Sequence, residues 1–117
     1  MSIHDMTNET GPVQNIDLQT DQAVIKLLND IDLYRSPDVR VVLLELTTQK
    51  VPVIGVDLTG VPYMDSSGLA TLVEALQRVK KYNGKLVLFG LQHRVRSIFE
   101  IARLTDLFTI QQAFDHE

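Results

Sequence analysis

The segment from residue 53 to residue 89 constrains the fold more than any other part of the chain. It alternates an apolar run, an amphipathic stretch and a second apolar run. The first run, Val53–Leu58, is short and rich in β-branched residues, as expected of a buried strand. The second run is Leu86–Phe89. A strand, a helix and a strand in this order predict a βαβ unit with parallel strands.

The stretch between the two runs predicts a helix from about Leu69 to Tyr82. Its apolar residues recur at the spacing of one helical face: Leu69, Leu72, Val73, Leu76 and Val79. We expect Asp65 or Ser66 to cap the first turn by accepting a hydrogen bond from a free backbone N–H. Asn83 and Gly84 are typical of a left-handed helix end.

Two further strands precede this unit. Val13–Leu18 and Ala23–Leu27 flank the polar turn 19–22 and predict an antiparallel hairpin. Residues 1–12 are polar and aperiodic, so we expect a flexible leader there and one domain over residues 13–117.

A helix is predicted to follow the hairpin. Ser36 as N-cap, Pro37 at the first helical position and Asp38 in the first turn are three agreeing start signals. Its inward residues would be Val39, Val42, Leu43 and Leu46. We expect a loop over residues 47–52.

The C-terminal part predicts one more helix and a short strand. The helix would start near His93 and pack through Val95, Ile98, Phe99 and Ala102. The strand would span residues 108–110. The whole is an α/β domain, with a small mixed sheet of four to five strands and amphipathic helices packed on it.

Composition limits the classes of function. The chain has 117 residues, enough for one domain, and a formal net charge of −4 that argues against a direct nucleic-acid partner. It contains 0 cysteines, which excludes disulfides and thiolate metal sites. No apolar run is long enough to insert in a membrane, and no signal-peptide pattern is present, so we expect a cytoplasmic protein.

Ser66 and Ser67 are the candidate functional residues. The predicted topology places them beyond the carboxyl end of a strand, on the first turn of a helix, where open α/β sheets present ligand-facing groups. The helix N-terminus favours an attached anion, so Ser67 could carry a phosphate without melting the helix. The alternative is that Asp65, Ser66 and Ser67 only cap the helix.

An enzyme is disfavoured. Ser67, His93 and Asp65 could form a hydrolytic triad, but the Gly-x-Ser-x-Gly elbow is missing because residue 65 is Asp. The chain has no phosphate-binding Gly-rich loop and no His/Asp/Glu cluster with metal-ligand spacing. We therefore expect no catalysis, no metal and no cofactor.

Residues 63–69, Tyr-Met-Asp-Ser-Ser-Gly-Leu, resemble the phosphorylation-site motif of the STAS domain of bacterial anti-sigma factor antagonists. The segments 29–32, 56–61, 83–86 and 95–99 also resemble that family, and the likeness spans roughly residues 13–112. In this family the serine before the motif's glycine is the phosphoacceptor, which is Ser67 here, with Ser66 as the second choice. The resemblance implies the STAS fold.

The resemblance also implies partners. The unmodified antagonist would bind an anti-sigma factor that is a serine kinase, phosphorylation would release it, and a serine phosphatase would reverse the modification. The surface implied for partner binding comprises Asp32, Tyr63, Met64, Asp65, Ser66, Gly68 and Leu69. The alternative role within the family is an unphosphorylated scaffold or a subunit of a stress-signalling assembly or of a membrane transport complex.

Overall fold

A five-stranded mixed sheet runs through the computed structural model, which describes residues 3–7 and 11–114. The strands lie in chain order: β1 (Val13–Leu18), β2 (Gln22–Leu28), β3 (Val53–Gly60), β4 (Lys85–Phe89) and β5 (Thr109–Gln111). β1 and β2 are antiparallel, and the remaining neighbours are parallel. The predicted hairpin, the parallel βαβ unit and the mixed sheet are confirmed.

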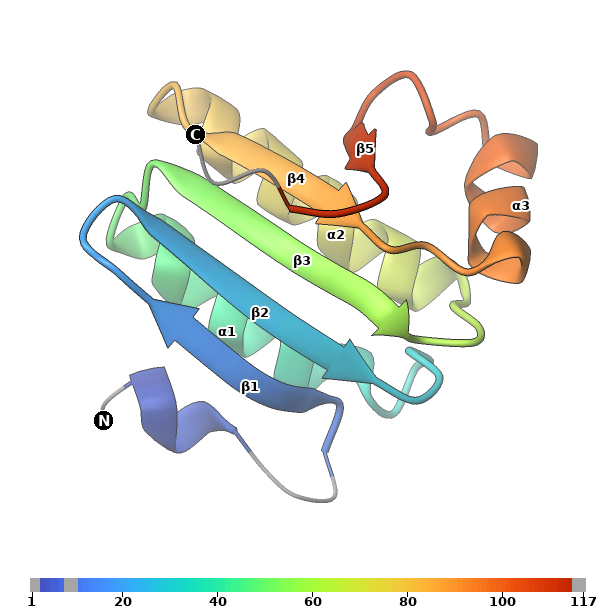
Figure 1. The fold of residues 1–117 in the computed structure, drawn as a ribbon, viewed down its shortest axis with the longest axis horizontal. Coiled ribbons are helices and arrows are strands. Elements are labelled where there is room, and N and C mark those ends of the chain that lie inside the picture. Colours follow the sequence, from blue (N-terminus) through green and yellow to red (C-terminus); the bar gives the residue numbers. More distant parts are fainter. Residues whose placement is uncertain (1–2, 8–10, 115–117) are drawn as a thin grey trace.

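Helices cover one face of this sheet. α1 (Ser36–Thr48) and α2 (Ser66–Lys81) lie side by side behind it, and α3 (His93–Ile101) stands beyond the end of β4 (Figure 1). The predicted inward face of α1 is correct, because Val39, Val42, Leu43 and Leu46 are all buried. On α2, Leu72, Leu76 and Val79 are buried, whereas Leu69 and Val73 are only partly buried.

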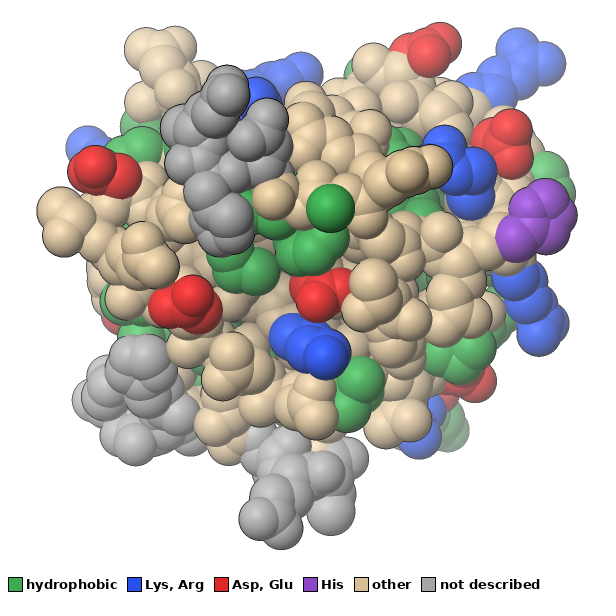
Figure 2. Space-filling view, viewed as in Figure 1, with side chains coloured by type: hydrophobic (Ala, Val, Ile, Leu, Met, Phe, Trp, Pro, Cys, Tyr) green, Lys and Arg blue, Asp and Glu red, His purple; other side chains and the backbone are tan. Residues whose placement is uncertain are grey.

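The opposite face of the sheet is crossed by the C-terminal segment (Figure 1). The Phe114 ring lies over Gly55, where a Cβ would approach it to 2.8 Å, and 5.7 Å from the Phe89 ring centroid. Figure 2 shows apolar side chains beside charged ones in the middle of this face. Phe89 and Phe114 line one hollow together with Lys26 and Asp57. α2, which begins with both candidate serines, covers the other face of the sheet (Figure 1).

Two predicted helix boundaries differ from the structure. Ser36 is not the N-cap of α1 but its first residue, and the N-cap is Arg35, which makes no side-chain cap bond. The reason is the preceding turn, in which the Ser36 N–H donates to the Asp32 carbonyl at 2.8 Å. α1 also continues through Thr48, two residues into the predicted loop.

The end of α2 is as predicted. Asn83 takes the left-handed conformation, with φ of 61°, and the Gly84 N–H donates to the Val79 carbonyl at 2.7 Å. α3 starts at His93 as expected and buries Val95 and Phe99, but Ala102 is exposed beyond its end. β5 starts one residue later than predicted.

Part of the segment expected as a leader has defined structure. Ile3–Met6 form a 3-10 turn, η1, and Ile3 is buried in the core near α1 and β1. Residues 1, 2 and 8–10 lie outside the described part of the chain.

Candidate functional site

Two loops meet at the carboxyl ends of β2 and β3. The Ile31 N–H donates to the Tyr63 carbonyl at 3.0 Å, and the Asp65 N–H donates to the Ile31 carbonyl at 3.1 Å. Ile31 thus forms a parallel bridge with Met64. These bonds extend the pairing of β2 and β3 beyond the sheet, so the segment before α1 and the segment before α2 are held side by side.

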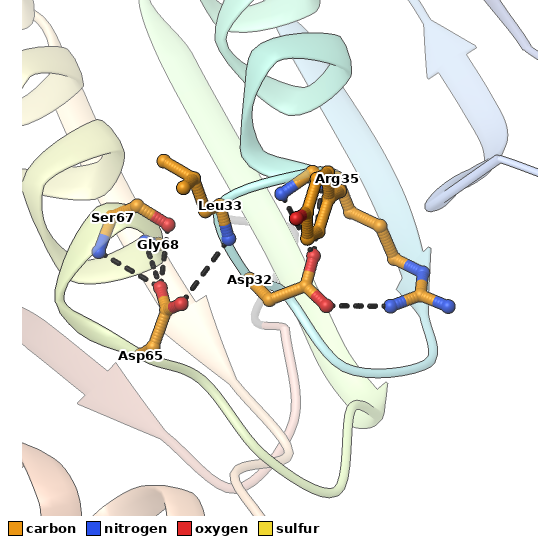
Figure 3. A network of polar contacts seen from close by, with 7 residues as sticks. Asp32, Leu33, Arg35, Asp65, Ser67 and Gly68 are labelled. Carbon is orange, nitrogen blue, oxygen red and sulfur yellow. Dashed lines mark hydrogen bonds and ion pairs between the residues drawn. The ribbon is translucent and has the colours of Figure 1, made fainter.

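Asp65 is the centre of the hydrogen-bond network at this edge (Figure 3). Its Oδ1 accepts from the Ser67 hydroxyl, from the Ser67 N–H at 2.8 Å and from the Gly68 N–H at 3.2 Å. Its Oδ2 accepts from the Leu33 N–H at 3.1 Å. Of the two predicted caps, Asp65 therefore caps α2, and it also binds the neighbouring loop.

These contacts favour the charged form of the carboxylate. The hydrogen bond from the Ser67 hydroxyl is the largest cause that lowers the pKa of Asp65, and the backbone N–H groups of Gly68, Ser67 and Leu33 lower it further. Partial burial opposes them. At neutral pH the helix N-terminus therefore already has an anion bound to it.

The two serines differ in exposure. Ser66, the first residue of α2, is exposed, and Ser67, the second, is half-buried. The Ser67 hydroxyl is oriented by its bond to Asp65. The Ser67 side chain is thus half-buried and fixed by Asp65, while Ser66 is exposed and makes no side-chain hydrogen bond among the described residues.

The other predicted surface residues fall into two groups. Tyr63, Leu69 and Asp32 are half-buried at the site, and the Arg94 guanidinium lies 4.9 Å from the centroid of the Tyr63 ring. Met64, at 1% exposure, and Gly68 are buried beneath it. A Cβ on Gly68 would clash with Met64 Cγ and lie 2.9 Å from the Ile31 carbonyl oxygen. The structure therefore corrects the expectation that the Met64 side chain contacts a partner, because Met64 supports the helix start from inside.

Asp32 organises the loop before α1. Its Oδ1 accepts from the Tyr34 N–H at 3.1 Å and the Arg35 N–H at 3.0 Å, and its Oδ2 pairs with the Arg35 guanidinium at 2.8 Å. The role of Asp32 seen here is to shape this turn (Figure 3).

Sequence reasoning missed Leu33 and Tyr34. They are 67% and 87% exposed, and both lie in the loop that Asp65 binds. The signal was present, since two large apolar side chains stand in an otherwise polar loop between Asp32 and the helix start. Nothing local in the sequence places the Leu33 backbone against Asp65.

The hydrolytic alternative has no support in the geometry. Ser67 donates directly to Asp65, with no histidine between them, and His93 is an exposed residue at the start of α3. Among the described residues no group of three or more His, Asp or Glu side chains could hold a metal ion. Over the same residues, no helix has the length and apolar character needed to span a bilayer.

Comparison with known proteins identifies the family. Residues 14–116 match the STAS domain. The chain belongs to the STAS domain family. It is 38% identical over 92 residues to the anti-sigma-B factor antagonist of Listeria monocytogenes, covering 79% of this chain and 81% of that protein. The resemblance drawn from residues 63–69 is confirmed at the level of the anti-sigma factor antagonist family.

Solved structures show the same fold at low sequence identity. An anti-sigma factor antagonist structure from Mycobacterium paratuberculosis has a TM-score of 0.77 at 18% identity, with 86% of each chain covered. The phosphorylated form of SpoIIAA from Bacillus has a TM-score of 0.67 at 18% identity, covering 86% of this chain and 91% of that one. The predicted STAS fold is therefore confirmed.

Proposed function

We propose that this STAS protein is an anti-sigma factor antagonist switched by phosphorylation of Ser67. With Ser67 unmodified it binds an anti-sigma factor that is a serine kinase, and with Ser67 phosphorylated it releases that factor. A serine phosphatase restores the binding form, and the catalysis belongs to the partners. The observation that carries the proposal is the half-buried Ser67 at the sheet edge, whose hydroxyl is held in one orientation by Asp65.

The geometry explains why a phosphate at Ser67 would disrupt a complex. Modification removes the proton that the hydroxyl donates to Asp65, and it places about 1.5 to 2 negative charges beside that carboxylate. The amides of Ser67 and Gly68, which could otherwise bind the phosphate, already donate to Asp65. The phosphate must therefore face outward, toward solvent or a bound partner.

An outward phosphate is tolerated in the free protein and costly at an interface. A charge that is buried without a partner costs several kcal/mol, and about 1.4 kcal/mol already changes affinity tenfold. Local electrostatics can therefore release the partner without a change of fold. The names of relatives agree with this role, since they include an anti-sigma-B factor antagonist and a SpoIIAA protein in a phosphorylated form.

The test is phosphorylation by the cognate anti-sigma factor, identified by co-purification. Incubation with ATP should add one phosphate, mapped to Ser67 by mass spectrometry, and should dissociate the complex. Ser67→Ala should accept no phosphate and should stay bound whatever the ATP supply. Ser66→Ala is the matched control and should behave as wild type. Phosphate on Ser66, or a complex that persists after Ser67 is modified, would refute the proposed switch.

A further inference from the structure

We propose that Leu33 and Tyr34 form an apolar anchor that binds the kinase domain of the anti-sigma factor, in an apolar groove with a basic rim. This inference rests on the proposed function and specifies the surface through which that function acts. We call the pair the Leu33–Tyr34 anchor.

The first argument is exposure. Among the described residues, five large hydrophobic side chains are exposed, and Tyr34, at 87%, is the most exposed of them. Leu33, at 67%, is its neighbour in sequence. Aromatic side chains of this kind are enriched among the residues that dominate binding energy at interfaces. Tyr34 is the aromatic member of the pair, and the exposed aliphatic side chain of Leu33 next to it adds to the apolar contact area.

The second argument is preorganisation. Each backbone N–H of Leu33, Tyr34 and Arg35 donates to a carboxylate: Leu33 to Asp65, and the other two to Asp32. The Arg35 N–H and the Ser36 N–H also donate to the Asp32 carbonyl. A loop that is fixed before binding loses less conformational entropy when it docks. The exposed side chains are therefore presented from a rigid turn.

The third argument is proximity to Ser67. The same Asp65 carboxylate accepts from the Ser67 hydroxyl through Oδ1 and from the Leu33 N–H through Oδ2 (Figure 3). Only one carboxyl group separates the phosphoacceptor from the backbone of the anchor. A kinase whose active site closes over the Ser67 hydroxyl must contact this loop, and this argument selects the kinase as the occupant.

The charge around the anchor indicates the chemistry of the partner surface. Asp30, Asp32, Asp38 and Asp65 lie in this loop, in the first turn of α1 or at the start of α2. Of the described cations at this site, Arg35 pairs with Asp32 and Arg94 stacks on Tyr63. The local excess of carboxylates favours lysine or arginine on the rim of the partner's groove, because complementary charges steer association.

The anchor and the serine have separable roles. The anchor contributes affinity in every encounter, whereas Ser67 decides whether the complex persists. Removing the anchor should therefore weaken recognition of the substrate serine without changing the chemical step once the complex has formed.

The test compares Tyr34→Ala and Leu33→Ala with wild type in binding to the unmodified protein and in steady-state phosphorylation by the anti-sigma factor. Each variant should raise Kd and the KM for phosphorylation about tenfold or more, with kcat unchanged. Tyr34→Phe, which keeps the ring, should restore most of the affinity. Raising the salt concentration should slow association for wild type.

Ile101→Ala is the matched control, since Ile101 is an aliphatic residue that is 84% exposed at the end of α3. It should bind and be phosphorylated as wild type. Wild-type affinity in both anchor variants would overturn the anchor and leave the switch intact, whereas no binding by wild type itself would overturn both. A fall in kcat at constant KM in the anchor variants would also overturn the anchor. A wild-type dimer that dissociates in Tyr34→Ala would overturn it as well, because that surface would then serve self-association.

Discussion

A hydrogen bond of 3.1 Å joins the backbone N–H of Leu33 to Oδ2 of Asp65, across 32 positions of sequence. Because the other oxygen of Asp65 accepts from Ser67 and Gly68, one side chain holds both the start of α2 and the exposed loop before α1. The phosphoacceptor candidate and the proposed docking surface are thus parts of one hydrogen-bonded unit.

Asp65→Ala should destabilise the protein and loosen this loop. The variant removes the N-cap of α2, which typically contributes about 1 kcal/mol, and leaves the Leu33 N–H without its acceptor. Urea unfolding measures the loss of stability, and amide hydrogen exchange at Leu33 measures the loosening. Asp106→Ala, at an exposed loop position, is the control. Unchanged exchange at Leu33 would show that Asp65 does not hold the loop.

Removing the Ser67 hydroxyl should raise the pKa of Asp65. The hydrogen bond from that hydroxyl is the largest cause that lowers this pKa, so Ser67→Ala should move the titration of the Asp65 carboxyl, followed by NMR, toward higher pH. Ser66→Ala should leave it in place. An identical titration in wild type and Ser67→Ala would mean that the hydroxyl does not bind Asp65 in solution.

The same lowered pKa predicts how stability depends on pH. A carboxyl whose folded pKa lies below its unfolded value, about 3.9 for Asp, stabilises the fold above that value and loses this contribution as pH falls through the folded pKa. Unfolding free energy measured from pH 6 down to pH 2 should therefore fall less steeply for Asp65→Asn than for wild type. The pKa of Glu74 is also lowered, chiefly by its hydrogen bond with Arg40, so Glu74 adds to the loss of stability at low pH. The Glu74→Gln variant measures this contribution separately.

Local patterns predicted the elements of the fold, and distant contacts explain what they missed. The βαβ unit, the hairpin and α3 have periodicities and end signals within a few residues, so they could be found from the sequence. The N-cap of α1 was misplaced because Ser36-Pro37-Asp38 is a strong local signal, while the turn made by Asp32 decides where the helix starts.

The candidate site also combines features that local sequence predicts with features that depend on distant contacts. The motif predicted a cap at Asp65 or Ser66, and the Asp65 cap is confirmed, because the cap and the amides that it binds lie within three residues of each other. The burial of Met64 and the position of Leu33 beside Asp65 depend on the bridge between Ile31 and Met64, which joins two loops far apart in sequence. No periodicity encodes such a pairing.

Gly68→Ala should be destabilising, although alanine is the better helix former. The exchange usually stabilises a helix by about 0.5 to 1 kcal/mol. Here the added methyl group would meet Met64 and the Ile31 carbonyl, and overpacking of this kind costs about 1 to 3 kcal/mol. Urea unfolding should show a net loss of unfolding free energy. The control is the opposite exchange at exposed Ala70 in the same helix, since Ala70→Gly should lose only helix propensity. A stabilised Gly68→Ala would show that Met64 yields easily.

Ser67→Asp should fold but should be less stable than Ser67→Asn, which has a similar shape and no charge. The new carboxylate cannot take the N-terminal amides of α2, because those of Ser67 and Gly68 donate to Asp65, and it adds a like charge beside that residue. Repulsion between two partly exposed charges is worth up to about 1 kcal/mol and is screened by salt. Urea unfolding at about 0.05 and 0.5 M salt should therefore show a difference in unfolding free energy between the two variants, and this difference should be smaller at high salt. Circular dichroism should show native helix content for both. If Ser67→Asp were instead more stable than Ser67→Asn, Asp65 would have released the amides of α2 to the new carboxylate. A phosphate on Ser67 would then be expected to bind the helix start instead of facing outward.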